Sequence, residues 1–191
     1  MKKSCSALFV KSAIALALAT PMLASAESQL VTGTATATGA AARLNFSVLI
    51  PKVLYLAVGS GSAALVPSTT VDTVSFDFTA TPTDVGSGTD KTAPGVNVRV
   101  LGNNGQITLA AAGSAGGLVS GTDSIPWAEI LSSSNDATNF SVPAVGGTST
   151  PVLSAGKVTN RTATWNYAYS NTNVVAPGTY AGQITYTATM P

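Results

Sequence analysis

GTYAGQITYTATMP, residues 178–191, is the stretch of the chain that most clearly indicates the fold. Apolar and aromatic side chains alternate here with threonine and other small or polar residues, so the segment predicts a β-strand with one buried and one wet face. Ala176-Pro177-Gly178 is a turn signal, because proline fixes φ and glycine tolerates positive φ. A strand with an open edge templates association, so a strand at the chain end raises the question of its partner. The face expected to be buried comprises Tyr180, Gly182, Ile184, Tyr186, Ala188 and Met190.

Other short segments alternate in the same way and are separated by glycine, proline and asparagine. No window of eleven or more residues after the N-terminal region shows a 3.6-residue period, so we expect no long helix. Short strands with frequent turn residues are typical of an all-β sandwich, with a closed barrel as the alternative. The turn Gly102-Asn103-Asn104-Gly105 predicts a hairpin between the strands that flank it. The expected strands are 43–58 with a break at Pro51, 74–79, 96–100, 107–111 and 163–169.

The N-terminus has the pattern of an export signal. Lys2 and Lys3 give it a positive start, and residues 13–23 form a short apolar stretch. Ala24-Ser25-Ala26 is a small-x-small cleavage site, so we expect residues 1–26 to be a signal peptide and the secreted chain to begin at Glu27. The apolar stretch is shorter than a membrane span requires, and we expect a soluble product after export.

The composition of the expected mature chain excludes several function classes. It has six basic residues against eight acidic ones, a net charge of −2, with no histidine and no cysteine. Nucleic acid is not an expected partner, because phosphate binding needs clustered lysine and arginine. The missing histidine and cysteine argue against most nucleophile–base pairs and transition-metal sites. We therefore expect a non-enzymatic protein without a cofactor; residues 84–90 could offer oxygens to Ca²⁺, but a turn is the favoured interpretation.

Aromatic residues are the candidates for ligand contact. Trp165, Tyr167 and Tyr169 share one face of an expected strand, and large aromatics in that pattern belong to a core. Trp127 follows Pro126 in an irregular region, where binding residues are concentrated. We therefore predict Trp127 as a possible contact for a host or surface glycan.

Residues 27–42 form an extended segment that alternates threonine with small residues. The predicted organisation is thus a signal peptide at 1–26, an extended segment at 27–42 and a β-sandwich domain at 43–191. The extended segment either forms the first strand of its own sandwich or pairs with another molecule, since both arrangements fit an alternating pattern.

The C-terminal residues resemble those of pilus subunits of the bacterial chaperone–usher class. Gly178 stands fourteenth from the end, Tyr180 follows it, and Thr185-Tyr186-Thr187 continues the alternation; Met190 occupies the penultimate position, where an aromatic residue is usual. The resemblance implies an immunoglobulin-like Greek-key sandwich that lacks one strand and is completed by donor-strand exchange. A periplasmic chaperone fills the open groove first, and the N-terminal extension of a neighbouring subunit then replaces it.

The resemblance also implies which residues assemble the fibre. The groove would be walled by the C-terminal strand and part of 43–58, with Gly178, Tyr180, Ile184, Tyr186, Ala188 and Met190 as acceptor residues. The implied partners are further copies of the chain, the chaperone and an outer-membrane usher, and the product is a cell-surface fibre for adhesion or biofilm formation. The alternative is a monomeric secreted module that binds a glycan or a surface protein. The implied donor residues are Leu30, Val31, Thr32, Gly33, Thr34, Ala35, Thr36, Ala37 and Thr38.

Overall fold

The computed structural model describes residues 27–33, 39–60 and 65–191; the expected signal peptide lies outside them. The chain divides into two units, Met1–Leu49 and Ile50–Pro191. In the first unit the described residues form no helix or strand, and all of them are exposed. Arg43 and Glu27 form an ion pair there at 2.8 Å. The strands that the structure describes all belong to the second unit.

The larger sheet is built around β9 (Thr159–Tyr169). β3 (Val96–Gly102) pairs with its first half, and β7 (Ile130–Ser134) and the short β2 (Lys91–Thr92) pair with its second half. β1 (Leu54–Val58) pairs with β3 and forms an edge of this sheet. All of these pairings are antiparallel, and long stretches of chain connect the paired strands.

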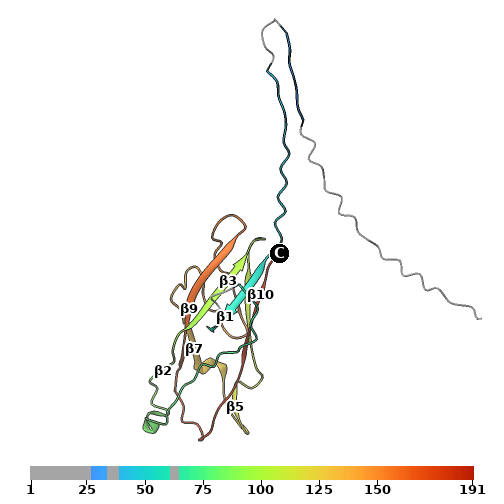
Figure 1. Ribbon diagram of the computed structural model, residues 1–191. Coiled ribbons are helices and arrows are strands. Elements are labelled where there is room, and N and C mark those ends of the chain that lie inside the picture. The colour runs from blue at the N-terminus through green and yellow to red at the C-terminus, as the bar shows by residue number, and fades with distance from the viewer. Residues whose placement is uncertain (1–26, 34–38, 61–64) are drawn as a thin grey trace, which may run out of the picture. The chain divides into compact units, whose positions relative to one another are not determined.

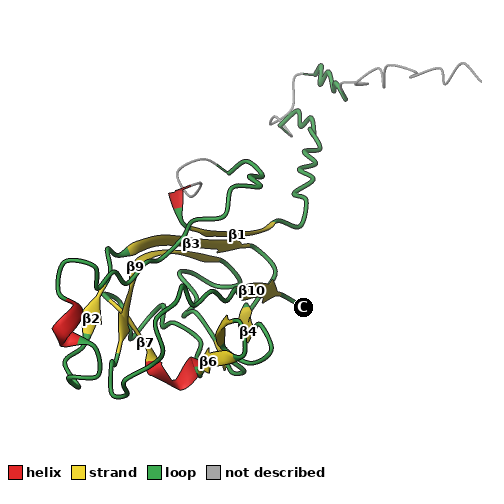
Figure 2. Cartoon of the chain, turned by 90° about the horizontal axis from the view of Figure 1, so that it is seen from below, coloured by secondary structure: helices red, strands yellow, loops and turns green. Residues whose placement is uncertain are grey.

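The second sheet contains β10 (Ile184–Thr189), β4 (Thr108–Gly113) and β8 (Thr148–Ser149), with β4 in the centre. A small ribbon of β5 (Leu118–Ser120) and β6 (Asp123–Ile125) lies apart from both sheets in the pairing (Figure 1). Figure 2 shows β1, β3 and β9 in one layer and β4 and β10 in the other. Two single-turn 3₁₀ helices complete the described elements, η2 (Pro82–Asp84) and η3 (Trp127–Glu129).

The core lies between the two sheets. Trp165 of β9 is fully buried at its centre, with its ring centroid 5.5 Å from Phe140 and 5.1 Å from Tyr186 of the opposite sheet. Alternate aliphatic side chains of β3 and the β4 region fill the space around these rings, because a period of two turns them all inward. They are Val98, Val100, Ile107 and Leu109.

The structure confirms the all-β sandwich. The aromatic face of β9 is core as predicted, since Trp165, Tyr167 and Tyr169 are all buried. The C-terminal strand also has its predicted two faces, but it begins at Ile184, and the residues from Gly178 to Gly182 precede it.

The predicted hairpin at Gly102–Gly105 is wrong. β3 belongs to the first sheet and β4 to the second, so the turn between them crosses from one layer to the other. Val98 and Leu109 are both buried, and an arch lets these two apolar faces bury each other instead of lying side by side in one sheet. The Asn-Gly signal specifies a turn but not which strands pair after it.

Two segments predicted as strands have no strand assignment in the structure. Residues 43–53 are exposed, and only the part from Leu54 onward joins a sheet. Residues 74–78 alternate as predicted, with Val74, Phe76 and Phe78 half-buried, but no backbone hydrogen bond joins them to a described strand. A period of two indicates which face of an extended segment is apolar. It does not indicate whether the backbone of that segment pairs with another strand.

Candidate functional site: the open seam between β1 and β10

β10 has a pairing partner on one edge. It pairs in antiparallel register with β4, from Ile184 opposite Gly113 to Thr189 opposite Thr108, and no other described strand pairs with it. Its threonines at 185, 187 and 189 are exposed, whereas Ile184, Tyr186 and Ala188 on the other face are half-buried. Met190 continues the inward set and packs against the core. The apolar face of β10 is therefore only partly covered by the rest of the sandwich.

β1 is the corresponding edge of the first sheet. Leu56 lies opposite Val100 and Val58 opposite Val98, so β1 turns the same face toward the core as β3 does. Leu56 and Val58 are half-buried, and Leu54 keeps 40% of its surface exposed. β3 is the one described strand that pairs with β1.

These two edges lie next to each other, one from each sheet (Figures 1 and 2). We call this place the open seam and define it by the inward residues of the two strands. Each of these edges lacks a second partner among the described strands and has apolar side chains on its inward face, so an extended strand could add to it through main-chain hydrogen bonds. The seam residues are Leu54, Leu56, Val58, Ile184, Tyr186, Ala188 and Met190.

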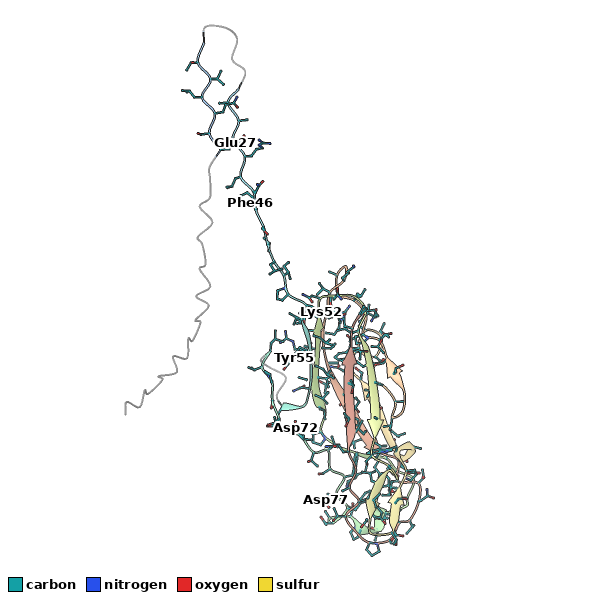
Figure 3. The ribbon with its side chains drawn as sticks, turned by 90° about the vertical axis from the view of Figure 1, so that its right-hand side faces the viewer. Glu27, Phe46, Lys52, Tyr55, Asp72 and Asp77 are labelled. Carbon is teal, nitrogen blue, oxygen red and sulfur yellow. The ribbon has the colours of Figure 1, made fainter. Side chains whose placement is uncertain are left out.

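The segment after β1 continues along the same side of the molecule. The Asp72 carboxylate accepts hydrogen bonds from the Ser60 amide and hydroxyl at 2.6 and 2.8 Å, which returns the chain to the end of β1. Figure 3 shows Lys52, Tyr55, Asp72 and Asp77 in this order down one side of the body. Val74 and Phe76 pack against the core from this segment.

At the end of the seam near Met190, polar side chains form hydrogen bonds to the backbone. Asn104 donates to the backbone oxygen of Pro191 at 2.6 Å, and Lys52 donates to the same oxygen. Asn103 donates to the oxygen of Pro51 at 2.8 Å and accepts from the amide of Val53 at 2.8 Å. The last residue of the chain and the entry to β1 are thereby held at one rim of the sandwich.

Two tyrosines link the sheets inside the core. The hydroxyls of Tyr167 and Tyr186 form a hydrogen bond of 2.9 Å. Burial raises the pKa of Tyr167 far above its ordinary value and also raises the pKa of Tyr186. Both phenols therefore remain neutral at physiological pH, and the bond between them is a neutral one.

A cavity of about 280 Å³ opens beside Trp127. Its walls include Ile130, Tyr167, Ile184 and Tyr186. Trp127 is half-buried in η3, and its indole nitrogen donates to the oxygen of Ser114 at 2.9 Å.

The Trp127 ring lies so close to two glycines that a side chain at either position would collide with it. A Cβ on Gly113 would lie 2.3 Å from the ring, and one on Gly182 would lie 2.9 Å from it. The predicted ligand contact therefore also packs closely against β4 and against the segment before β10.

The structure brings together some of the predicted site residues and leaves others apart. Ile184, Tyr186, Ala188 and Met190 share the seam. Gly178 and Tyr180 do not lie on β10: a Cβ on Gly178 would meet Ser120, and the Tyr180 hydroxyl donates to the oxygen of Ala176.

The predicted donor segment is only partly described. Leu30 to Gly33 are exposed and form no strand, and residues 34–38 lie outside the described residues.

Part of 43–58 was predicted to wall the groove, but residues 44–50 form no strand in the structure. Four alternate apolar side chains of this segment keep most of their surface exposed: Leu44 68%, Phe46 85%, Val48 83% and Ile50 74%. Pro51, which interrupts the pattern before β1, was the signal that could have predicted that the strand begins only after it.

The loop at 84–90 is organised by a side chain from elsewhere in the chain. The buried Asn171 donates to the backbone oxygens of Asp84 and Thr89 and accepts from the amide of Gly86 at 2.8 Å. In the described parts of the chain, no three histidine, cysteine, aspartate or glutamate side chains gather as metal ligands would. Nor do the described residues include a helix long and apolar enough to cross a membrane.

Comparison of the sequence with models of known protein families and with curated proteins finds no match.

Proposed function

We propose that the protein is a structural subunit of an extracellular fibre that grows by β-strand addition between copies. The observation that carries this proposal is the open seam, where β1 and β10 each lack a second partner among the described strands and their apolar faces stay half-covered. A strand from the exposed unit upstream of Ile50 of a neighbouring copy would pair with β10 through main-chain hydrogen bonds and cover those faces. Such a head-to-tail contact does not close on itself, so it propagates a fibre.

In this proposal the sandwich is immunoglobulin-like, with a Greek-key order that lacks one strand. An uncovered seam is an aggregation hazard before assembly, so a periplasmic chaperone would cover it and an outer-membrane usher would mediate export. The role requires neither catalysis nor a cofactor, in keeping with a mature chain without histidine or cysteine. The fibre would serve adhesion or biofilm formation at the cell surface.

A second candidate function rests on the cavity beside Trp127. A half-buried indole over a space of about 280 Å³ lined by aromatic and aliphatic side chains suits a small ligand with an apolar face, such as a sugar ring. In this case the protein would be a monomeric binding module. Trp127→Phe would weaken glycan binding without unfolding, and the wild-type chain would stay monomeric when exported.

Electron microscopy and gel filtration of the exported chain test the fibre proposal. We expect the wild-type chain to form fibres and a chain lacking residues 27–49 to remain monomeric, because the deletion removes the strand that would be donated. Circular dichroism of the deleted chain serves as the control, since the β-sandwich begins after the deletion and should keep its β spectrum. A wild-type chain that is folded and monomeric after native secretion would contradict the proposal.

A further inference from the structure

Residues 44–50 are an alternating apolar segment without a partner in the sandwich. Their large side chains are exposed by two thirds or more, and no backbone hydrogen bond joins them to a described strand. Soluble proteins do not keep a run of contiguous apolar side chains in water without a reason. A period of two puts Leu44, Phe46, Val48 and Ile50 on one face. Asn45, Ser47 and Leu49 occupy the other face.

This segment matches the open seam in length and pattern. On β10, the inward positions from Ile184 to Met190 are four alternate residues that span six residue steps. Leu44 to Ile50 also offers four alternate apolar residues over six steps. Two extended strands rise by about the same 3.3 Å per residue, so all four pairs can face each other at once.

Residues 30–38, the donor segment predicted from the sequence, have fewer large apolar side chains to place in the seam than residues 44–50 have. Within 30–38, the only apolar side chains larger than alanine are Leu30 and Val31, which are neighbours and therefore point to opposite faces. A strand that inserts there would place mostly threonine, glycine and alanine against half-buried leucine, valine and tyrosine.

We infer that residues 44–50 of one copy, rather than residues 30–38, form the strand that enters the open seam of the next copy. The inference rests on the proposed fibre function and identifies the part of the chain that performs it. Phe46 and Val48 would lie against the middle of β10, near Tyr186 and Ala188. Leu49 would face outward with the threonines of β10.

The chain's own seam is a poor destination for this segment. Asn103 holds both Pro51 and Val53 at the rim, so the chain is fixed immediately before β1. A return into the same seam needs a turn of at least two residues upstream of Pro51, which would use Leu49 and Ile50. A neighbouring copy can present all four side chains, and for that reason we commit to a second copy as the occupant.

Cysteine cross-linking tests this inference cleanly, because the one cysteine of the sequence, Cys5, precedes Glu27. Centred on the seam, Ser47 lies opposite Thr187 whether the inserted strand runs parallel or antiparallel to β10. Opposed Cα atoms on paired strands are about 4.5–5.5 Å apart, within the range that a disulfide spans. The experiment mixes the single variants Ser47→Cys and Thr187→Cys during assembly and compares this mixture with Thr34→Cys mixed with Thr187→Cys, since residue 34 is the centre of 30–38.

We expect the first mixture to form a disulfide-linked heterodimer. Its yield, measured on denaturing gels without reductant, should be at least about tenfold higher than the yield from the second mixture. Fibres in which Thr34→Cys links to Thr187→Cys and Ser47→Cys does not would overturn the inference while leaving the fibre function in place. A double variant, Ser47→Cys with Thr187→Cys, that forms its disulfide within one monomer would overturn the choice of a second copy. A wild-type chain that forms no fibre would overturn the proposed function itself.

A matched pair of charge substitutions provides a second readout. Phe46→Asp would place a carboxylate on the face that enters the seam, and Leu49→Asp would place the same group three residues away on the outer face. Because an unpaired charge is costly in an apolar contact, we expect Phe46→Asp to reduce fibre yield about tenfold or more and Leu49→Asp to leave it nearly unchanged. Both side chains are exposed in the single molecule, so neither change should disturb folding of the sandwich. Equal effects of the two substitutions would contradict the inference.

Discussion

Asn171 is the clearest case of a single side chain that holds a distant loop. It is 1% exposed and its backbone has a φ of 52°, a conformation that asparagine adopts more readily than most residues. Its amide nitrogen donates to the oxygen of Asp84 at 2.7 Å and its amide oxygen accepts from Gly86. The loop at 84–90 is therefore fixed by neutral hydrogen bonds, as suits a chain in which 9% of residues are charged.

We predict that Asn171→Gly lowers the free energy of unfolding by about 1–3 kcal/mol, because it keeps the backbone conformation but leaves buried loop groups without partners. Asn171→Ala should cost about 1–2 kcal/mol more, since alanine is strained at positive φ. Urea denaturation of both variants measures the two effects separately. Equal stabilities of the two variants would show that backbone strain plays no part.

Glu129 holds the neighbouring loop by a charged group. Its carboxylate accepts hydrogen bonds from the hydroxyls of Ser170 and Thr172, and these bonds, the one from Ser170 first, hold the pKa of Glu129 below its ordinary value. A carboxyl whose pKa is lower in the folded state stabilises the fold above its unfolded pKa, and this stabilisation is lost as the pH falls through the folded pKa.

We therefore expect the stability difference between the wild type and Glu129→Gln to be constant from pH 6 to 8. The difference should narrow as the pH falls below about 4.5, the ordinary pKa of this side chain. Thermal unfolding of both proteins across this pH range measures the difference. A difference that widens toward low pH would contradict the assignment.

At the scale of elements, the sequence predicts faces better than partners. The alternation in β9 and β10 gave the buried sides of both strands correctly, because burial of apolar area is a local property of the pattern. It could not show that β3 and β4 belong to different sheets, nor that residues 44–50 form no strand and stay exposed. Those outcomes depend on which backbone edges meet, and side chains that alternate look the same in a paired and an unpaired strand.

The tyrosine pair between β9 and β10 offers a test of how the two sheets are joined. Tyr186→Phe removes one hydroxyl and leaves that of Tyr167 buried without its partner, so we expect a loss of about 1–3 kcal/mol in the free energy of unfolding. The double variant Tyr167→Phe with Tyr186→Phe should recover part of this loss, since it buries no unpaired hydroxyl. Additive losses in the double-mutant cycle would show that the two hydroxyls act independently.

At the scale of the whole molecule, the sandwich and the upstream unit differ in what they leave exposed. The sandwich buries its aromatic residues around Trp165 but leaves the seam half-covered, whereas the upstream unit exposes Phe46 and its apolar neighbours. Both units therefore expose apolar surface. In the proposed fibre, contact between copies would remove part of this surface from water, which is the dominant favourable contribution to association.

Assembly through an apolar strand should respond weakly to salt. Residues 44–51 contain no charged side chain, and the inward residues of the seam are all apolar or aromatic. Interactions between exposed charges weaken strongly as added salt shortens the screening length, but burial of apolar surface does not. We expect the yield and length of fibres to be unchanged, or slightly increased, between about 50 mM and 500 mM sodium chloride, where the screening length falls severalfold. Sedimentation of fibres assembled from the purified chain across this range measures the response, with Leu49→Asp as a control that adds a charge outside the seam. A steep loss of fibre in high salt would mean that charged groups hold the copies together and that the apolar strand does not.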